Sequence, residues 1–282
     1  MKEKHILFQN TTLHYKTTGT GLPIVLLHGF AEDSTIWDNQ VEYLKNNYKL
    51  IIPDLPGSGG SPMLNTPQSL EELLGVRSDK PIGMEDYAAC IKQVLETEKI
   101  DRCIMIGHSM GGYITLAFAE KYPGSLICLG LFHSSAYADD DTKVETRKKA
   151  ISFIEANGTV AFLKTSIPGL FYDQGNSEPA DALISKGKSF LPKALVQYYK
   201  AMIMRPDRTP ILKNARFPVL MIMGEQDKAV PFKHSLEQSY MPFRSYIHIL
   251  RESAHMGMLE EPGRSNEILA NFLLALQPIN NV

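Results

Sequence analysis

The sequence predicts an α/β fold in which a mostly parallel, doubly wound central sheet of about eight strands is flanked by helices and carries an all-helical lid insertion. Two patterns predict it. Short apolar runs alternate with segments of helical spacing along most of the chain, and one long helical block interrupts the alternation. A chain of 282 residues, of which 44% are hydrophobic, is long enough to bury such a core.

The expected strands begin with an edge pair. Residues 6–15 are expected to supply two short antiparallel strands at one edge of the sheet. Six continuous apolar runs follow, and runs of this kind suit strands that are covered on both faces, as in a parallel sheet. These runs are residues 23–30, 49–61, 102–109, 125–132, 218–227 and 244–250.

Between the apolar runs lie segments whose hydrophobic residues recur at helical spacing. The first, residues 34–48, has Ser34 as its expected N-cap and places Ile36, Trp37 and Val41 near one face. Alternation of strand and helix implies crossover connections, which put helices on both faces of a parallel sheet. Further helices are expected over residues 84–99, 111–123 and 261–276.

One block departs from this alternation, between about Ser134 and Arg216. It contains no expected strand and has the pattern of several helices separated by glycine and proline. An all-helical block between two strands of one sheet is expected to be an insertion above the sheet edge. The chain is therefore predicted to divide into a core domain, residues 1–133 and 217–282, and a helical lid or cap, residues 134–216.

Composition and charge limit the classes of partner. With 29 basic and 31 acidic residues the net charge is −2, so neither nucleic acid nor an anionic membrane is expected as a partner. No apolar run is long enough to cross a bilayer, and residues 1–16 lack the apolar centre of a signal peptide. A cytoplasmic location is the resulting expectation. Cys90, Cys103 and Cys128 lie far apart in apolar segments and are expected to be small core residues.

The segment 105–113, MIGHSMGGY, places a serine between glycines where a strand gives way to a helix. Its GHSMG fits the pattern G-x-S-x-G, and so tight a turn is expected to strain the backbone of Ser109. Side chains at positions 107 and 111 would collide across the turn, which explains the glycines there. The hydroxyl of Ser109 then stands beside the amide of Met110, a hydrogen-bond donor for an oxyanion at a helix N-terminus.

A serine hydroxyl becomes a good nucleophile only when a base takes its proton and an acid orients that base. Asp227 follows the strand expected to end at Gly224, and His255 follows the strand expected to end near residue 250. The order serine, aspartate, histidine favours a catalytic triad over an ordinary turn serine, turn aspartate and surface histidine.

The motif HGF is expected to supply the second donor of an oxyanion hole, the backbone amide of Phe30. His28 is expected to brace that loop. His108 is expected to pack in the turn rather than react.

With these motifs in register the sequence resembles the α/β-hydrolase family, over residues 6–133 and 217–276. The matching motifs are HGF, DLPGSGGS, GHSMGG, GEQDKAVP and SAHMGMLEEP. The resemblance implies an esterase-like member with the triad Ser109, Asp227 and His255, an oxyanion hole from the amides of Phe30 and Met110, and neither metal nor organic cofactor. The helical block matches the family's lid in position and size but in no motif, so the substrate is not implied.

The expected function is acyl transfer on a small, largely apolar carboxylic ester or related acyl substrate, which makes the protein a carboxylic ester hydrolase. His133 and Ser134 leave the sheet at its carboxyl edge and are candidates to line the substrate pocket, together with Tyr198 and Met202 of the lid. Alternatives within the enzyme class are a C–C bond hydrolase, an aminopeptidase and a perhydrolase. A slow-turnover protein that senses a ligand and signals through lid movement is an alternative from another class.

Two features stay open at the level of sequence. Residues 63–83 are unusually long for a strand-to-helix connection, and they could pack beside the site or lie on the surface. The sequence is compatible with a monomer or a homodimer.

Overall fold

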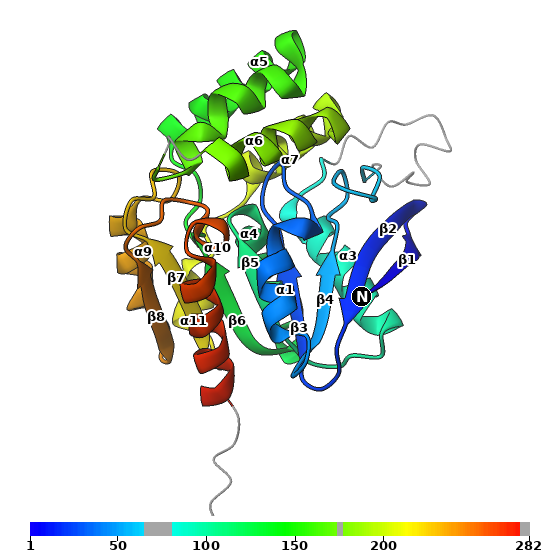
Figure 1. Ribbon diagram of the computed structural model, residues 1–282, viewed down its shortest axis with the longest axis vertical. Coiled ribbons are helices and arrows are strands. Elements are labelled where there is room, and N and C mark those ends of the chain that lie inside the picture. The colour runs from blue at the N-terminus through cyan, green and yellow to red at the C-terminus, as the bar shows by residue number, and fades with distance from the viewer. Residues whose placement is uncertain (65–80, 174–176, 277–282) are drawn as a thin grey trace, which may run out of the picture.

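The computed structural model describes residues 1–64, 81–173 and 177–276, and in them eight strands form one sheet with the order β1-β2-β4-β3-β5-β6-β7-β8 (Figure 1). The predicted fold class is confirmed. The strands are β1 Lys2–Phe8, β2 Thr11–Thr18, β3 Pro23–Leu27, β4 Lys49–Pro53, β5 Cys103–His108, β6 Leu126–Phe132, β7 Val219–Gly224 and β8 Ser245–Leu250.

Strand direction follows the predicted division into an edge pair and a parallel core. β1 and β2 are antiparallel to each other, β2 is antiparallel to β4, and the remaining neighbours are parallel. Every residue of β5 and β7 is buried, which explains why these strands are continuous apolar runs in the sequence. β8 lies at the other edge, and the outward-facing side chains of Ile247 and Ile249 are exposed.

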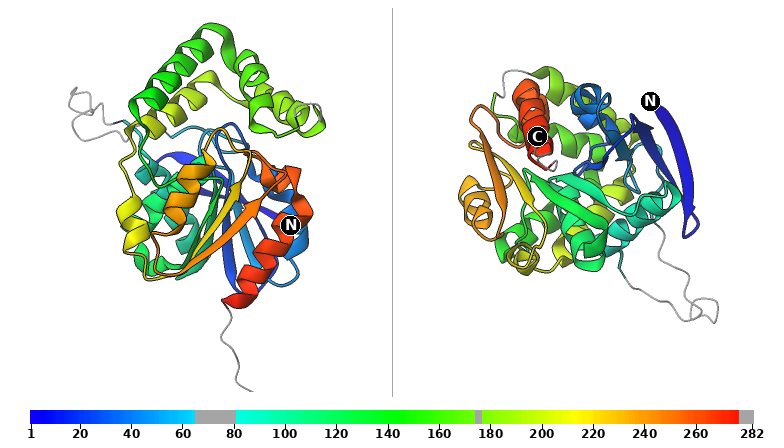
Figure 2. Two further views of the ribbon diagram at one scale, coloured as in Figure 1. Left: turned by 90° about the vertical axis from the view of Figure 1, so that its left-hand side faces the viewer. Right: turned by 90° about the horizontal axis from the view of Figure 1, so that it is seen from below.

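Helices cover both faces of the sheet (Figure 2). The 3₁₀ turn η1 Ser34–Trp37 leads into α1 Asp38–Leu44, which packs beside α11 Pro262–Ala275 on one face, while α3 Met84–Thr97 and α4 Met110–Lys121 lie on the other. Three further short elements complete the core: η2 Pro123–Ser125, α9 Phe232–Ser239 and α10 Gly257–Glu260.

The predicted N-cap at Ser34 is wrong. Asp33 precedes the first helical turn, and its carboxylate accepts a hydrogen bond from the amide of Thr35 at 2.9 Å. The amide of Ser34 instead donates to the carboxylate of Asp54, also at 2.9 Å.

Between β6 and β7 the described residues form helices and no strand. They are α5 Asp141–Ser166, η3 Pro168–Leu170, α6 Ser177–Lys186, η4 Gly187–Ser189, α7 Pro192–Met204 and α8 Thr209–Lys213. α5, α6 and α7 lie together above the carboxyl edge of the sheet (Figure 1). α5 bends at Gly158, whose φ of 79° and ψ of 171° are open to glycine only. The division of the chain into a core domain and a lid domain stays a prediction.

The core lies on both sides of the sheet and includes the predicted cysteines. Cys90, Cys103 and Cys128 are buried, unpaired thiols. Within residues 1–64, 81–173 and 177–276, none of the helices combines the length and the apolar character that a membrane span requires. Most of the segment 63–83, whose role the sequence leaves open, lies outside the described residues.

Candidate active site

Ser109 occupies a strained turn between β5 and α4. Its backbone has φ 49° and ψ −115°, so the predicted strain is present. Neighbouring strands hold this conformation, because the amide of Ser109 donates to the carbonyl of Phe132 at 3.0 Å and its carbonyl accepts from the Ser134 hydroxyl at 2.7 Å. The serine therefore sits at a fixed point above the sheet edge.

The glycines on either side of this turn are required by close backbone contacts. A Cβ at Gly107 would lie 2.2 Å from the carbonyl carbon of Gly111, as the sequence predicts. A Cβ at Gly111 would instead lie 2.5 Å from the carbonyl oxygen of Leu27, so the second glycine is needed by the adjacent strand β3 rather than across the turn. These glycines allow the start of α4 to approach the loop after β3.

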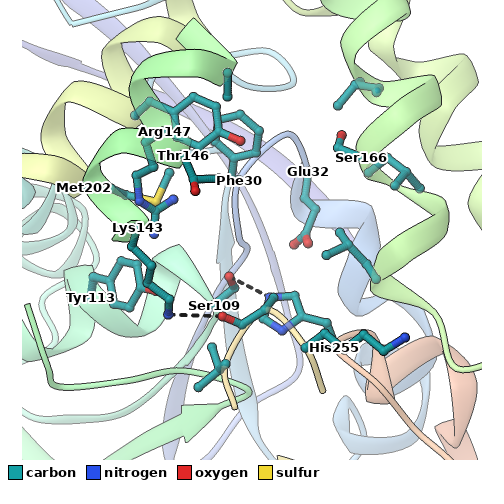
Figure 3. Close-up of a pocket in the computed structure, with 18 residues that line it drawn as sticks. Phe30, Glu32, Ser109, Tyr113, Lys143, Thr146, Arg147, Ser166, Met202 and His255 are labelled. Atoms are coloured by element: carbon teal, nitrogen blue, oxygen red, sulfur yellow. Dashed lines mark hydrogen bonds between the residues drawn. The ribbon is translucent and has the colours of Figure 1, made fainter. Parts of the chain in front are cut away.

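The structure brings Ser109, His255 and Asp227 into one chain of hydrogen bonds. Nε2 of His255 lies 2.8 Å from Oγ of Ser109, and Nδ1 lies 2.8 Å from Oδ2 of Asp227. Figure 3 draws the hydrogen bond between His255 and Ser109 as a dashed line. The other carboxylate oxygen, Oδ1, accepts hydrogen bonds from the amides of Ala229 and Val230 at 2.8 and 2.9 Å. These amides fix the carboxylate in the orientation that faces the imidazole.

Burial and charge shift the pKa values of Asp227 and His255 in opposite directions. Burial favours the neutral form of Asp227, but the charge of His255 and its hydrogen bond hold the pKa of the carboxyl well below its usual value. Burial would likewise lower the pKa of His255, but the carboxylate of Asp227 outweighs it and raises that pKa above its usual value. The two side chains are thus suited to stabilise an imidazolium next to Ser109.

A second buried set of hydrogen bonds lies behind His255. Oε2 of Glu32 accepts from the amide of Gly29 at 2.7 Å and lies 3.0 Å from Nδ1 of His108, while Nε2 of His108 lies 2.9 Å from the carbonyl oxygen of His255. Burial favours neutral Glu32, but the neighbouring His108 holds the pKa of the carboxyl below its usual value. Both nitrogens of His108 face oxygen acceptors, so the ring links the oxyanion loop to the backbone of His255.

The predicted packing roles of His28 and His108 are consistent with these contacts. His28 is buried, and its Nδ1 lies 2.8 Å from the carbonyl of Gly29 while its Nε2 accepts from the amide of Leu55 at 2.9 Å. Glu32 was missed at the level of sequence. Asp33 follows it directly, so the sequence offers no signal that distinguishes Glu32 from its acidic neighbour.

The two predicted oxyanion donors lie at the ends of the loops that meet at Ser109. α4 begins at Met110, directly after Ser109, and Phe30 lies in the loop after β3, on the wall of a cavity. Within the described chain, neither amide takes part in a loop or turn hydrogen bond. Their role in holding an oxyanion stays a prediction.

A cavity of about 360 Å³ opens beside Ser109 and His255, beneath α5 and α7 (Figure 3). One part of its wall is apolar and the other carries charged groups. Apolar side chains include Phe30, Leu163, Ile167, Leu170, Met202 and Val230, and charged ones are Glu32, Lys143, Arg147 and Lys228.

Of the four residues predicted to line the substrate pocket, Met202 lines this cavity. The other three make hydrogen bonds elsewhere: Nδ1 of His133 accepts from the amide of Gly224 at 3.1 Å, Ser134 braces the turn of Ser109, and the hydroxyl of Tyr198 lies 2.7 Å from that of Ser58. His133 lies next to the acid rather than on the cavity wall, its Nδ1 3.5 Å from Oδ2 of Asp227. Lys143 and Arg147 were not anticipated, although both stand on one face of a helix at i and i+4 spacing.

One group of three side chains within the described residues has the spacing of metal ligands. The ligand atoms of His133, Asp227 and His255 lie within 4.8 Å of one another. Hydrogen bonds to amides and between the rings and the carboxylate already engage Nδ1 of both histidines and both oxygens of Asp227. The arrangement is therefore explained by the chain from acid to base to serine.

Comparison with known proteins shows what the chain is similar to. The family described as alpha/beta hydrolase fold matches residues 23–153. The chain is 27% identical to a 2-hydroxy-6-oxononadienedioate/2-hydroxy-6-oxononatrienedioate hydrolase of Burkholderia vietnamiensis, over 93% of this chain and 90% of that protein. It is 24% identical to a 2-hydroxy-6-oxo-6-phenylhexa-2,4-dienoate hydrolase of Comamonas testosteroni, over 93% of this chain and 91% of the relative.

A solved structure agrees with the fold over almost the whole chain. A thermophilic esterase from Thermogutta terrifontis, with malate bound, superposes with a TM-score of 0.88 at 24% identity, covering 99% of this chain and 100% of that one. The chain has the α/β-hydrolase fold, and residues 23–153 match the family model of that name. The solved structure is named as an esterase and the two relatives as hydrolases of 2-hydroxy-6-oxo acids, so these similarities leave the bond that is cleaved undecided.

Proposed function

We propose that this protein is a serine hydrolase that cleaves a small carboxylic ester or related acyl compound by acyl transfer. The observation that carries the proposal is the chain of hydrogen bonds from Asp227 through His255 to Ser109, which ends on the wall of a cavity. The cavity volume of about 360 Å³ suits a small organic substrate.

In the first half of the reaction Oγ of Ser109 bonds to the carbonyl carbon, and its proton passes to Nε2 of His255. The amides of Phe30 and Met110 donate to the oxygen that becomes negative in the tetrahedral intermediate. Asp227 keeps the Nδ1 proton in place and stabilises the imidazolium. As the intermediate collapses, the proton on Nε2 moves to the leaving alcohol, and the acyl group stays on Ser109.

In the second half a water molecule takes the place of the alcohol. His255 removes a proton from the water, which attacks the acyl carbon, and the proton then returns to Oγ as the ester bond to Ser109 breaks. The products are a carboxylic acid and the free enzyme. We assign residues 134–216 the role of a lid, because Lys143, Leu163 and Met202 from that segment line the same cavity as Ser109.

The test compares wild type with Ser109→Ala on short-chain 4-nitrophenyl esters. Loss of the nucleophile should lower kcat by about 10⁴-fold or more, since the triad acts as a unit. Ser125→Ala, at the amino end of β6 and remote from the cavity, is the matched control and should retain wild-type rates. Equal rates for wild type and Ser109→Ala would reject the proposal, and a single slow turnover by wild type would favour the ligand-sensing alternative.

A second candidate is hydrolysis of a carbon–carbon bond. It is favoured by the relatives named as hydrolases of 2-hydroxy-6-oxo dienoates, compounds that contain no ester. The same serine and histidine could serve that reaction. Decay of the absorbance of such a dienoate, measured beside the esters, decides between the two. A kcat/KM for the dienoate about 100-fold above that of the best ester would make the second candidate the function.

A further inference from the structure

The wall of the cavity carries more positive than negative charge. Lys143 and Arg147 reach into it from successive turns of α5, as Figure 3 shows, and Lys228 adds a third cation from the loop after Asp227. Glu32 is the one acidic side chain among the described lining residues, and it already accepts hydrogen bonds in the set that contains Gly29 and His108. These cations therefore face the cavity without an acidic partner across it.

Lys143 has a single polar partner for its ammonium group within the described chain. Nζ donates to the carbonyl oxygen of Ala229 at 3.2 Å, and its side chain is half-buried. An ammonium group can donate three hydrogen bonds. A partly buried cation without a carboxylate partner is less stable than one with a counterion, so this group is poised to accept an anion.

Arg147 belongs to a buried cluster in which guanidinium groups outnumber carboxylates. Its Nε and Nη2 donate to Asp139 at 2.5 and 3.2 Å, and Arg205 donates to the same carboxylate at 2.9 Å. The side chain of Asp139 has no exposed surface, and two guanidinium groups share its one negative charge. Arg205 lies 3.9 Å from the ring centre of Tyr113, which itself lines the cavity. This cluster keeps one positive charge beside Lys143.

We propose that Lys143 and Arg147 form a carboxylate-binding subsite, and that the substrate of Ser109 is an ester whose far end carries a carboxylate. The ester part of this inference rests on the proposed function, whereas the subsite rests on the cations alone. Phe30, Leu163 and Met202 give the same cavity an apolar surface that suits a short hydrocarbon chain. The substrate is thus apolar in its middle and anionic at one end, which revises the largely apolar substrate expected from the sequence.

The experiment uses two esters that differ only at the far end. Ethyl hexanoate and monoethyl adipate have acyl chains of equal length, ending in a methyl group and in a carboxylate. Wild type should hydrolyse monoethyl adipate with a kcat/KM about tenfold higher at low ionic strength, as a charge-assisted hydrogen bond implies. This preference should shrink as salt is raised, because salt screens partly exposed charges. Equal or lower kcat/KM for the adipate ester, in this pair and in the corresponding glutarate and pimelate pairs, would overturn the subsite.

Variants of Lys143 test whether this residue binds the carboxylate of the substrate. Lys143→Gln should lower the adipate-to-hexanoate ratio about tenfold, and Lys143→Glu should invert the preference. Lys148→Gln is the matched control, because Lys148 is an exposed residue of the same helix that pairs with Glu145, and it should keep the wild-type ratio. An unchanged ratio in both Lys143 variants, with wild-type circular dichroism, would contradict the proposal.

Failure of the subsite and failure of the proposed function are separable. If Ser109→Ala still hydrolyses ethyl hexanoate, the proposed function is wrong whatever the preference between the esters. If wild type hydrolyses neither ester, binding of adipate itself is measured by calorimetry. Binding by wild type that is about tenfold weaker in Lys143→Gln supports the subsite, and absence of binding by wild type overturns it.

Discussion

At the scale of single residues, the bonds of Asp227 decide where protons lie in the site. Because Oδ1 accepts from two amides of its own loop, Oδ2 is held facing Nδ1 of His255. The proton of a neutral imidazole then sits on Nδ1, and Nε2 presents its lone pair to the hydroxyl of Ser109. A rigid acid thus selects the tautomer that can act as a base.

Replacing this acid should change both the rate and its pH dependence. Neutral His255 is the base, so kcat/KM should fall as pH drops through the pKa of His255, which lies above its usual 6.5 because of Asp227. In Asp227→Asn the charge is gone while burial remains, so the midpoint should move to lower pH. The variant should also lose about 10³–10⁴-fold in kcat, because the tautomer is no longer fixed.

The pH profile of kcat/KM on a 4-nitrophenyl ester measures both effects. Asp101→Asn, a change at an exposed aspartate, serves as the control and should keep the wild-type profile. A midpoint for Asp227→Asn equal to that of wild type, or a kcat within threefold of it, would assign the orienting role to another group.

At the scale of elements, the passage from β5 to α4 depends on a glycine that no other residue can replace. A Cβ at Gly107 would meet backbone atoms of Gly111 and Gly112 at 2.2–2.4 Å, and backbone in a buried turn cannot move aside cheaply. Gly107→Ala should therefore lower the free energy of unfolding by about 3 kcal/mol or more, or prevent folding. Gly124→Ala is the control, since its Cβ would meet nothing within 4 Å. Urea denaturation of both variants makes the comparison, and equal midpoints would contradict the contact.

The elements that the sequence predicts well are those whose local pattern agrees with their environment. β5 and β7 are buried in every residue, so their apolar runs reveal them directly. α9, with the sequence FKHSLEQS, was not anticipated, because it is only eight residues long and has two large apolar residues, Phe232 and Leu236. The N-cap at Asp33 differs from the predicted Ser34 because the aspartate and the serine are adjacent and both residue types cap helices well.

The residues of the candidate site also divide into those that the sequence predicts and those that it does not. Ser109, Asp227 and His255 were predicted because each follows a strand end within a recognisable motif. Glu32 and Arg147 carry no such motif, and their roles arise only when distant segments fold together. His133, Ser134 and Tyr198 are close to the site in sequence or in pattern, yet their side chains are taken up by internal hydrogen bonds, which spacing along the chain does not reveal.

At the scale of the whole molecule, the helical segment is tied to the loop that carries the base. The amide of His255 donates to the carbonyl of Leu170 at 2.9 Å, and the amide of Tyr172 donates to the carboxylate of Glu260 at 2.6 Å. Glu260 also accepts from the amides of Ala254 and Met256, on both sides of His255. Movement of the residue 170–172 region would therefore displace the histidine loop, which couples access to the cavity with the geometry of the triad.

The stability of the whole protein should depend on pH through one buried histidine outside the cavity wall. Burial lowers the pKa of His133 to about 4, against about 6.5 for an ordinary histidine. Between these pH values the unfolded chain binds a proton that the folded chain does not, so stability falls as pH drops through this window. The slope from this group is about 1.4 kcal/mol per pH unit, or about 3 kcal/mol in total.

Urea denaturation of wild type and His133→Gln at pH values from 7 to 4 isolates this contribution. The glutamine can still accept from the amide of Gly224 but cannot titrate, so the difference in free energy of unfolding between the two proteins should shrink steadily below pH 6.5. The raised pKa of Glu260 acts in both proteins alike and cancels in the difference. The pKa of Asp227 is lowered in part by His133, but it lies below this pH range. His234→Gln, a change at an exposed histidine, should show no such trend. If the difference in free energy of unfolding stays constant from pH 7 to pH 4, His133 is charged in the folded protein at low pH. The assignment of a neutral imidazole beside Asp227 would then be wrong.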